Sequence, residues 1–343
     1  MTQDFTNPFV GISKSPYHLI AAGEGANNIT LPDGSVTSCS EVKKDLSYDQ
    51  LFAWNLEPKP LLKWVEYLST HPECQCKLVV DSGAYSMWSR GKEFNIDEYI
   101  DFLNSNGVIE QAFWVAEADV IPGKMNVDPT EEERAAAPEK SWQNYLYMIE
   151  RVKIPKKIVP IFHMGEDFKH LERMLEFTFR DGDHIPYIGI SPRNDVSVNA
   201  KIEWYEKVWK IIGHSSNKDV LTHNFGCTSI SIMEQYPSMS SDSTSWIRSA
   251  SFGNIQIVVN GKIKMVYVSN RNTKSPDYIL NQSRAVIEDV EKICYKIGHG
   301  IKLKDLLEDE NGSLRMLFNL YSLADWRMQF KFEGHQVFKE SLW

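Results

Sequence analysis

The chain has 343 residues, 42% of them hydrophobic and 24% charged, and a formal net charge of −9. This composition is typical of a globular protein, and the bulk charge gives no indication of a nucleic-acid binder. No apolar run approaches the roughly 18 residues of a membrane span, and the first residues lack the basic and apolar parts of a signal peptide. We therefore expect a soluble, cytoplasmic protein with no membrane partner.

Five cysteines, odd in number and scattered, argue against a disulfide framework and for a reducing compartment. The charge is unevenly distributed, because residues 243–343 carry 14 Lys and Arg against 11 Asp and Glu in an otherwise acidic chain. A basic C-terminal part can contact phosphates, although solvated helix surfaces explain it almost as well.

Residues 1–57 are the least regular, with a strand predicted at 17–22 and a turn at 31–35, followed by a helix at 61–68. From Lys77 the pattern becomes strand, polar loop, amphipathic helix and strand again. The predicted strands are 78–81, 112–119, 158–163, 187–191 and 220–224. The predicted helices between them are 96–106, 139–152, 168–179, 199–212 and 228–236. Such alternation is typical of parallel βα units.

After Ser251 the pattern changes to a hairpin at 255–268, with Asn260 and Gly261 in its turn, and two helices at 276–297 and 313–330. These elements suit the closure of a barrel better than a separate domain. We interpret the chain as a single α/β domain, a TIM-like (βα)8 barrel with a C-terminal β-hairpin and helical elaboration. Its predicted parts are N-terminal strands and a helix in 1–76, a catalytic core in 77–253 and a closing segment in 254–343.

The most informative stretch is residues 77–86, KLVVDSGAYS. Its apolar run predicts a buried parallel strand that ends on Asp81, before the small residues that begin with Ser82 and Gly83. A carboxylate at the carboxyl end of such a strand is poorly placed for stability and well placed for chemistry. Tyr85 adds a flat aromatic face. An Asp that caps a turn is the alternative explanation.

Polar or small residues also end the strands that follow. Their positions are Asp119, His163, Gly189, His223 with Asn224, and Asp242 in a hydroxyl-rich segment. Each alone has a simpler explanation: a turn cap or helix N-cap for the acids, hydrogen-bonded core positions for the histidines, and close packing for the glycine. Independent accidents would not place them at successive strand ends, and in a βα barrel those ends converge on one mouth.

Other chemistries fit the sequence less well. The chain has no GxxxxGK[ST] phosphate loop, no GxGxxG after a strand and no GxSxG elbow. Cys74 and Cys76 lack the second Cys or His pair of a zinc site, so neither a metal nor another cofactor is expected. Two carboxylates and two histidines without a metal-binding set indicate acid–base or covalent carboxylate chemistry.

Taken in order, these segments resemble those of the tRNA-guanine transglycosylase superfamily, most closely its DpdA branch, the DNA 7-deazaguanine transglycosylases. The resemblance spans residues 77–253. DSGAYS from Asp81 is similar to the family's DSGGYQ or DSGGF, and AEADVIPG around Asp119 to its D-[ED]-x-x-P segment. The chain has IFHMG where the family has IVQGG, and GIS where the family has G-[GI]-[LS]. It has HNFG in place of MGVG, and DSTSW in place of FDCVLPTR, which contains the family's nucleophilic Asp.

The resemblance implies a pentosyltransferase that replaces guanine in DNA with a 7-deazaguanine, of which 7-cyano-7-deazaguanine is favoured. Asp242 is then the nucleophile that forms a covalent glycosyl-aspartate, and Asp81 handles the proton of the base. The implied base-binding residues are Ser82, Tyr85, Asp119, His163, Gly189, Ile190, Ser191, His223 and Phe225. Weaker candidates for phosphate contacts are Arg193, Arg248, Lys262, Lys264, Arg271 and Lys274. The target nucleotide must leave its helix to enter the pocket.

Departures from the family pattern favour DNA over tRNA. The zinc-binding CxCxxC and His downstream of the nucleophile and a PUA-like RNA-binding domain are not recognisable, and His163 replaces the usual Gln. The expected partners are DNA, with tRNA as the alternative, and the free 7-deazaguanine base. A homodimer is possible on the sequence alone. The location is the cytoplasm, that of the host if the chain is phage-encoded.

Three rival functions stay open. The first is the same exchange on tRNA, and the second is a non-catalytic barrel subunit that binds nucleic acid and positions a partner enzyme. The third is a metal-dependent hydrolase using Asp81, His163 and His223, which the spread of these ligands disfavours.

Overall fold

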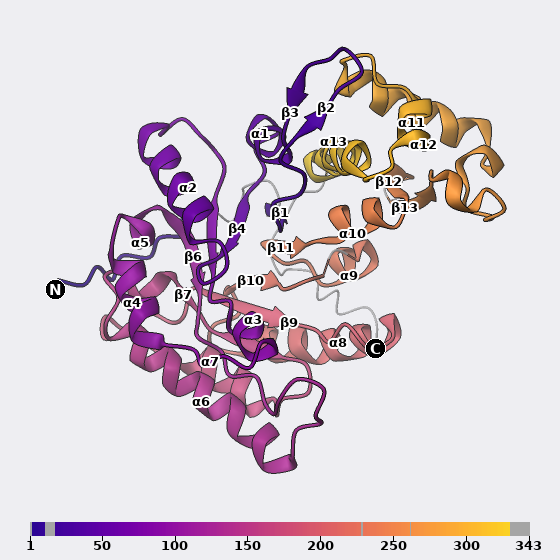
Figure 1. Cartoon of the computed structure of the whole chain (residues 1–343). Coiled ribbons are helices and arrows are strands. Elements are labelled where there is room, and N and C mark those ends of the chain that lie inside the picture. The colour runs from indigo at the N-terminus through magenta and orange to yellow at the C-terminus, as the bar shows by residue number, and fades with distance from the viewer. Residues whose placement is uncertain (1, 11–17, 228, 261, 330–343) are drawn as a thin grey trace. The chain divides into compact units, whose positions relative to one another are not determined.

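The computed structural model describes residues 2–10, 18–227, 229–260 and 262–329 (Figure 1). The chain forms two compact units. Among the described residues, the first unit holds 2–10 and 50–241, and the second holds 18–49 and 242–329. The chain passes from the first unit to the second within one strand, β11 (Ser240–Ser243), between Ser241 and Asp242.

The first unit is built on parallel strands that follow one another in sequence order. One sheet has the order β4-β5-β6-β7, and the first half of β11 pairs with β10 in the series β10-β9-β8. All pairings between these neighbours are parallel, which confirms the predicted α/β class with parallel strands. The described pairings stop short of showing a closed barrel. The bounds are β4 Gln50–Ala53, β5 Leu78–Asp81, β6 Ala112–Ala116, β7 Ile158–Val159, β8 Ile161–His163, β9 Tyr187–Ser191 and β10 Leu221–Asn224.

Pro160 interrupts one strand of the first unit and divides it into β7 and β8. The Glu117 N–H donates to the Val159 carbonyl oxygen (3.0 Å), and the Gly189 N–H donates to the Pro160 carbonyl oxygen (2.8 Å). The Ile161 N–H donates instead to the side-chain oxygen Oε1 of Glu117, at 2.7 Å. The Glu117 carboxyl group therefore takes the place of a backbone acceptor at the break.

Helices follow the strands of the first unit and pack against one face of its sheets. Strand side chains such as Leu78, Val80 and Ile188 join helix side chains such as Tyr145 and Trp204 in one buried cluster. The helix bounds are α2 Pro58–Thr70, α3 Ala84–Ser89, α4 Ile96–Asn104, α5 Val108–Gln111, α6 Glu131–Ile149, α7 Lys169–Glu176, α8 Val198–His214 and α9 Ile230–Gln235. The other face carries aromatic side chains, where Phe9 packs against Phe113 and Tyr187 at ring-centroid distances of 5.4 and 5.1 Å.

Helix α6 begins at Glu131, well before the start predicted at residue 139. The helix contains Pro138, which has no N–H to donate to the helix. A capping box lies further upstream: the Thr130 hydroxyl accepts from the Glu133 N–H (3.1 Å), and the Glu133 carboxylate accepts from the Thr130 N–H (2.9 Å). The cap sets the start of the helix, and Pro138 is retained inside it.

The second unit joins an N-terminal segment to the C-terminal third of the chain. The first segment provides β1 His18–Ala21, β2 Ile29–Thr30, β3 Val36–Thr37 and α1 Cys39–Asp45. The later segment provides α10 Ser245–Ser251, β12 Asn254–Val259, β13 Lys262–Tyr267, α11 Arg284–Ile297, α12 Leu303–Glu308 and α13 Ser313–Gln329. Strand β1 confirms the strand predicted there, although Tyr17 lies outside the described residues. The predicted turn is confirmed by the Leu31 N–H, which donates to the Ser35 carbonyl oxygen at 2.9 Å.

The predicted C-terminal hairpin is confirmed, because β12 and β13 pair antiparallel from Asn254 opposite Tyr267 to Val259 opposite Lys262. Gly261 of its predicted turn lies outside the described residues. Helix α11 begins later than predicted, because a short 3-10 turn, Ile279–Asn281, precedes it. Among the described helices, none has both the length and the apolar character needed to cross a lipid bilayer.

Helix α13 contributes a buried amide that ties the second unit together. The Asn319 side chain accepts from the Gln256 N–H (2.7 Å) and donates to the Trp246 carbonyl oxygen (2.8 Å) and the Ser249 hydroxyl (3.0 Å). One side chain therefore joins α13 to both β12 and α10.

We predict that Asn319→Ala lowers the free energy of unfolding by about 2–4 kcal/mol, because the Gln256 N–H and the Trp246 carbonyl lose a buried partner. Denaturant unfolding followed by circular dichroism measures the change. The matched control is Asn28→Ala, at an exposed asparagine of the same unit, which should change the free energy by less than about 0.5 kcal/mol. Equal effects of the two substitutions would contradict the assigned role.

Candidate active site

Strand β5 ends in a tight turn that holds Asp81. Strand alternation directs the Leu78 and Val80 side chains to the helix-covered face and gives Asp81 the opposite one. The half-buried Asp81 carboxylate accepts from the Gly83 N–H at 3.1 Å. Gly83 has φ +70°, and a Cβ there would lie 2.1 Å from the Asn55 side-chain oxygen, so glycine is required. The Asn55 amide in turn donates to the Gly83 carbonyl oxygen at 3.1 Å.

Ser82 connects this turn to Asp119. The buried Ser82 hydroxyl donates to Oδ1 of Asp119 at 3.3 Å and accepts from the Ala84 N–H at 3.2 Å. The sequence predicted both Ser82 and Asp119 as site residues, and the first unit brings them into contact. One carboxylate oxygen of Asp119 is thereby fixed from the β5 side.

His163 lies between two carboxylates. Its ring nitrogen Nε2 is 3.4 Å from Oδ2 of Asp119, and Nδ1 is 3.2 Å from Oε1 of Glu166. The other Glu166 oxygen accepts from the His163 backbone N–H at 3.1 Å. The His163 side chain is 28% exposed, and both carboxylates are less exposed than the ring.

This arrangement keeps His163 charged. Burial by itself lowers the pKa of His163, but the hydrogen bonds with Asp119 and Glu166 and their negative charges outweigh it and raise the pKa to about 10. The ring is therefore an imidazolium at neutral pH, and both of its N–H groups face carboxylates. Sequence reasoning missed Glu166; the only signal was its position three residues after a strand-end histidine, which lets its carboxylate reach back to that residue.

Glu117 is a second acid that sequence reasoning missed. It is fully buried, Oε1 accepts the Ile161 N–H, and within the described structure Oε2 has no hydrogen-bond partner. Burial raises the pKa of Glu117 well above its usual range, and the charge of Asp119 two residues later raises it further. Burial therefore favours the neutral form of Glu117, which lies between the Pro160 break and the Asp119–His163 pair.

A row of residues crosses the neighbouring strands at one level. Ile161, Gly189, His223 and Ser240 are consecutive partners in the register of β8 to β11. A Cβ on Gly189 would lie 2.5 Å from the Phe225 ring, so this ring uses the space that the missing side chain leaves. Among the other predicted base contacts, Ile190 is buried in the helix-facing cluster, and its carbonyl oxygen accepts from the Phe225 N–H at 2.9 Å.

His223 belongs to a buried hydrogen-bonded series. Its Nδ1 lies 2.8 Å from the Ser240 hydroxyl, which lies 2.6 Å from the Tyr187 hydroxyl. The His223 ring also packs against Trp114 and Phe225, with centroids 4.6 and 4.5 Å apart. These surroundings are those of the hydrogen-bonded core histidine that the sequence left open as the alternative.

Ser191 and Tyr85 lie at the outer end of this face. Ser191 pairs with His163 in the register of β8 and β9, and its carbonyl oxygen accepts from the Met164 N–H at 2.9 Å. Tyr85 is 60% exposed, and its ring lies 5.5 Å from the Trp88 ring. An exposed ring next to a held carboxylate is suited to stacking on a flat ligand.

Asp242 belongs to the second unit, whereas the first unit contains the other catalytic and base-binding candidates. It lies in the second half of β11, two residues after Ser240, and its side chain is half-buried. The following Ser243 carbonyl oxygen accepts from the Ala22 N–H at 3.2 Å, and helix α10 begins at Ser245. Asp242 is therefore a strand residue; the helix N-cap that the sequence allowed as the alternative lies at Thr244.

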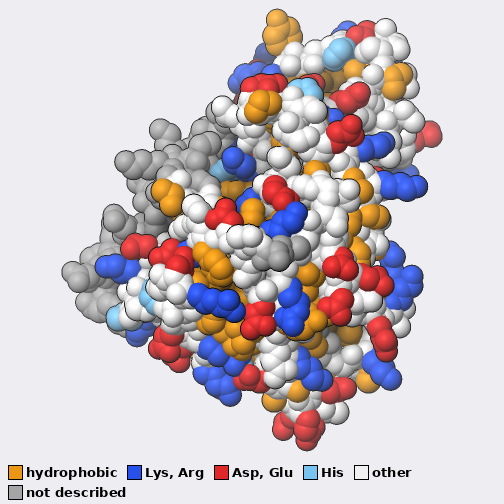
Figure 2. All heavy atoms as spheres, turned by 90° about the vertical axis from the view of Figure 1, so that its left-hand side faces the viewer, with side chains coloured by type: hydrophobic (Ala, Val, Ile, Leu, Met, Phe, Trp, Pro, Cys, Tyr) orange, Lys and Arg blue, Asp and Glu red, His pale blue; other side chains and the backbone are white. Residues whose placement is uncertain are grey.

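The predicted phosphate contacts have different surroundings. Arg193 makes a two-point ion pair with Asp195, at 2.9 and 2.5 Å, and Lys264 donates to the Gln282 side chain at 2.6 Å. Arg248, Arg271 and Lys274 are exposed, and the Lys262 side chain lies outside the described structure. Figure 2 shows one face of the molecule, on which acidic and basic side chains are intermixed.

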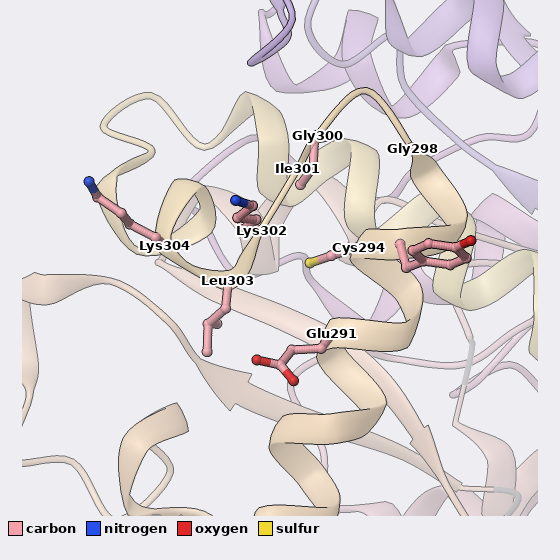
Figure 3. Close-up of a pocket in the computed structure, with 9 residues that line it drawn as sticks. Glu291, Cys294, Gly298, Gly300, Ile301, Lys302, Leu303 and Lys304 are labelled. Atoms are coloured by element: carbon pink, nitrogen blue, oxygen red, sulfur yellow. The ribbon is translucent and has the colours of Figure 1, made fainter.

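A cavity of about 580 Å³ lies apart from these residues, within the second unit between α11, the loop that follows it and α12 (Figure 3). Cys294 points into it, and burial raises the pKa of this thiol to about 12, so it is protonated at neutral pH and a poor nucleophile. Within the described ranges, no group of three or more His, Cys, Asp or Glu side chains is arranged to hold a metal ion.

No protein-family model matches this chain, and no curated protein matches its sequence.

We predict that the His163 ring titrates near pH 10 in the folded protein, as followed by NMR of its ring protons. The folded pKa lies above the value near 6.5 of an unfolded chain, so the stabilisation is fully present below about pH 6.5 and lost as the pH rises through 10. Glu166→Gln should lower the midpoint by more than about one unit, because it removes one of the two charges. The exposed Glu176→Gln, on α7, is the control and should leave it unchanged. A midpoint near 6.5 in the unaltered protein would contradict the two ion pairs.

We predict that Glu117→Gln changes the free energy of unfolding by no more than about 1 kcal/mol, because a neutral amide keeps the acceptor for the Ile161 N–H. Glu117→Ala should lower it by about 2–4 kcal/mol, since a buried N–H loses its partner and a cavity is left. Denaturant unfolding at neutral pH compares the two variants. If both are equally unstable, the assignment of a neutral Glu117 is wrong.

Proposed function

We propose that this protein is a base-exchange transglycosylase that replaces guanine in DNA with a 7-deazaguanine, with 7-cyano-7-deazaguanine as the favoured base. The observation that carries the proposal is the series Ser82–Asp119–His163–Glu166, which lies beside the Asp81 turn at the carboxyl ends of successive parallel strands. Acidic groups held by neighbouring side chains at such strand ends are suited to catalysis.

The proposal includes a fold more specific than parallel α/β. In it, the parallel strands belong to one TIM-like (βα)8 barrel, with the β12–β13 hairpin and the C-terminal helices as elaboration of a single domain. Its support is the sequence order of the strands in the first unit, since each strand neighbours the next along the chain. In such a barrel, Asp81 and Asp242 would act on the same nucleotide.

The proposed exchange has two steps and needs no cofactor. In the first, the Asp242 carboxylate attacks C1′ of the target nucleotide, the C1′–N9 bond breaks with its electron pair leaving on guanine, and Asp81 donates a proton to that base. In the second, the incoming 7-deazaguanine gives its N9 proton to Asp81, and N9 attacks C1′ and displaces Asp242. The protein is regenerated, and the two bases have changed places.

Asp119 is proposed to read the edge of the base. Its carboxylate is held by Ser82 and His163, and oxygen lone pairs that these contacts leave can accept from base N–H groups. The His163 ring faces the carboxylate's other oxygen, Oδ2, at 3.4 Å. The Gly189 backbone and the neighbouring predicted residues would border the base, and Tyr85 would stack on it after the nucleotide has left its helix.

We predict that Asp242→Ala abolishes incorporation of labelled 7-deazaguanine into DNA while the protein stays folded. The unaltered protein should also form a covalent adduct with DNA that survives a denaturing gel, whereas the variant should form none. Asp277→Ala, at an exposed acid of the second unit, is the control and should retain both properties. Incorporation by Asp242→Ala at the normal rate would contradict the proposal.

The same assay separates the rival functions. Equal amounts of DNA and tRNA are offered together, and nucleosides from each are analysed by mass spectrometry. Exchange in tRNA alone would replace the proposal with the tRNA reaction. Binding without exchange or adduct would favour the non-catalytic subunit, and activity that a chelator removes would favour a metal-dependent enzyme.

A further inference from the structure

Helix α3 ends in a turn that holds two basic residues close to its aromatic side chains. The Arg90 and Lys92 N–H groups both donate to the Met87 carbonyl oxygen, at 3.1 and 2.9 Å. The Gly91 N–H between them donates to the Trp88 carbonyl oxygen at 2.9 Å. The segment from Arg90 to Lys92 therefore folds back on the end of α3, the helix that carries Trp88.

A third basic residue, Lys124, lies in the loop after β6, and a hydrogen bond joins this loop to α3. The Trp88 indole N–H donates to the Gly123 carbonyl oxygen at 2.7 Å, and Lys124 is the next residue. The loop is closed by the Val127 N–H, which donates to the Lys124 carbonyl oxygen at 3.0 Å. Gly123 has φ +73°, and a Cβ there would lie 2.9 Å from Pro129, which fixes the path of the loop.

These residues form a surface that we call the α3 strip: Tyr85, Trp88, Arg90, Lys92 and Lys124. The three basic side chains are exposed, and none has an ion pair within the described structure. They differ in this from Arg193, whose charge Asp195 neutralises. Two exposed acids, Glu93 and Asp128, flank the strip, so its balance is positive by one charge.

The strip also presents unusual apolar surface. The Tyr85 and Trp88 rings are 5.5 Å apart, and Tyr85 is 60% exposed. Met125 and Val127 of the tied loop are exposed as well. The exposed Tyr85 ring and the half-buried Trp88 ring, together with cations that have no ion pair in the described structure, match the two parts of a single-stranded nucleic acid. Its bases stack on aromatic faces, and its phosphates pair with Lys and Arg.

We propose that the α3 strip binds the unpaired DNA segment next to the nucleotide that is exchanged. Arg90, Lys92 and Lys124 contact its phosphates, and Trp88 stacks on the base that neighbours the one against Tyr85. Duplex DNA does not offer these base faces, so the strip recognises DNA that is locally opened. This inference rests on the proposed function for the identity of the nucleic acid, and it names the residues that hold the strand.

The test is fluorescence anisotropy of the full-length protein with a short, labelled single-stranded oligodeoxynucleotide between about 50 and 200 mM salt. The triple variant Arg90→Ala, Lys92→Ala, Lys124→Ala should bind at least about tenfold more weakly, and its slope of log affinity against log salt should fall by about 2. Trp88→Ala should weaken binding about tenfold, whereas Trp88→Phe should retain most of it because a ring remains for stacking.

The matched control removes equal charge from the same unit. Lys59→Ala, Lys63→Ala, Lys140→Ala changes three exposed lysines on α2 and α6 and should leave affinity within about twofold. Equal losses in the two triple variants, or unchanged binding by the α3 triple variant, would overturn the proposal. Preferential, strip-dependent binding of an RNA of the same sequence would overturn the assignment to DNA.

Incorporation of labelled 7-deazaguanine, measured on the same preparations, separates this inference from the proposed function. If the unaltered protein exchanges the base, and the α3 triple variant also exchanges it and binds DNA fully, then only the proposed role of the α3 strip is overturned. Strip-dependent binding of DNA with no exchange by the unaltered protein would overturn the base-exchange function alone.

Discussion

The charged His163 ring between Asp119 and Glu166 is the interaction on which the rest of the candidate site depends. Each of its ring nitrogens faces a carboxylate, and both carboxylates are less exposed than the ring. The imidazolium compensates both, and Ser82 adds a neutral donor to Asp119. The site therefore holds the Asp119 carboxylate in place by a contact to each of its two oxygens.

The same region depends on a break in the sheet. Pro160 has no N–H, and the strand resumes at Ile161 through a hydrogen bond from its N–H to the Glu117 side chain. Glu117 lies two residues before Asp119, and Ile161 lies two residues before His163. One short hydrogen bond therefore joins the two segments that carry the ion pair, and burial of Glu117 disfavours a further negative charge beside it.

Local sequence was sufficient to predict some of these features. The DSGAYS turn could be predicted because a buried strand, an acid and a glycine follow one another directly. The roles of Glu117 and Glu166 could not, because both depend on which strand lies beside β6 and β8 and on burial that the sequence does not state. The start of α6 was predicted too late, at residue 139, because the capping box between Thr130 and Glu133 was not recognised. The ion pair of Arg193 with Asp195, two residues on, was visible in the sequence and was overlooked.

If the proposed function is correct, the contacts of the His163 ring with two carboxylates affect how the base is recognised. Both ring nitrogens face carboxylates, so the ring is not available to donate to the base, and reading falls mainly on the oxygens of Asp119. These acceptors match N–H groups that guanine and 7-deazaguanine share, so they hold either base. The two bases differ at position 7, where guanine has a nitrogen that can take a proton and 7-deazaguanine has a carbon. A proton from Asp81 can therefore assist the departure of guanine at position 7, whereas the replacement base offers no nitrogen there, and this difference favours exchange in the direction of incorporation.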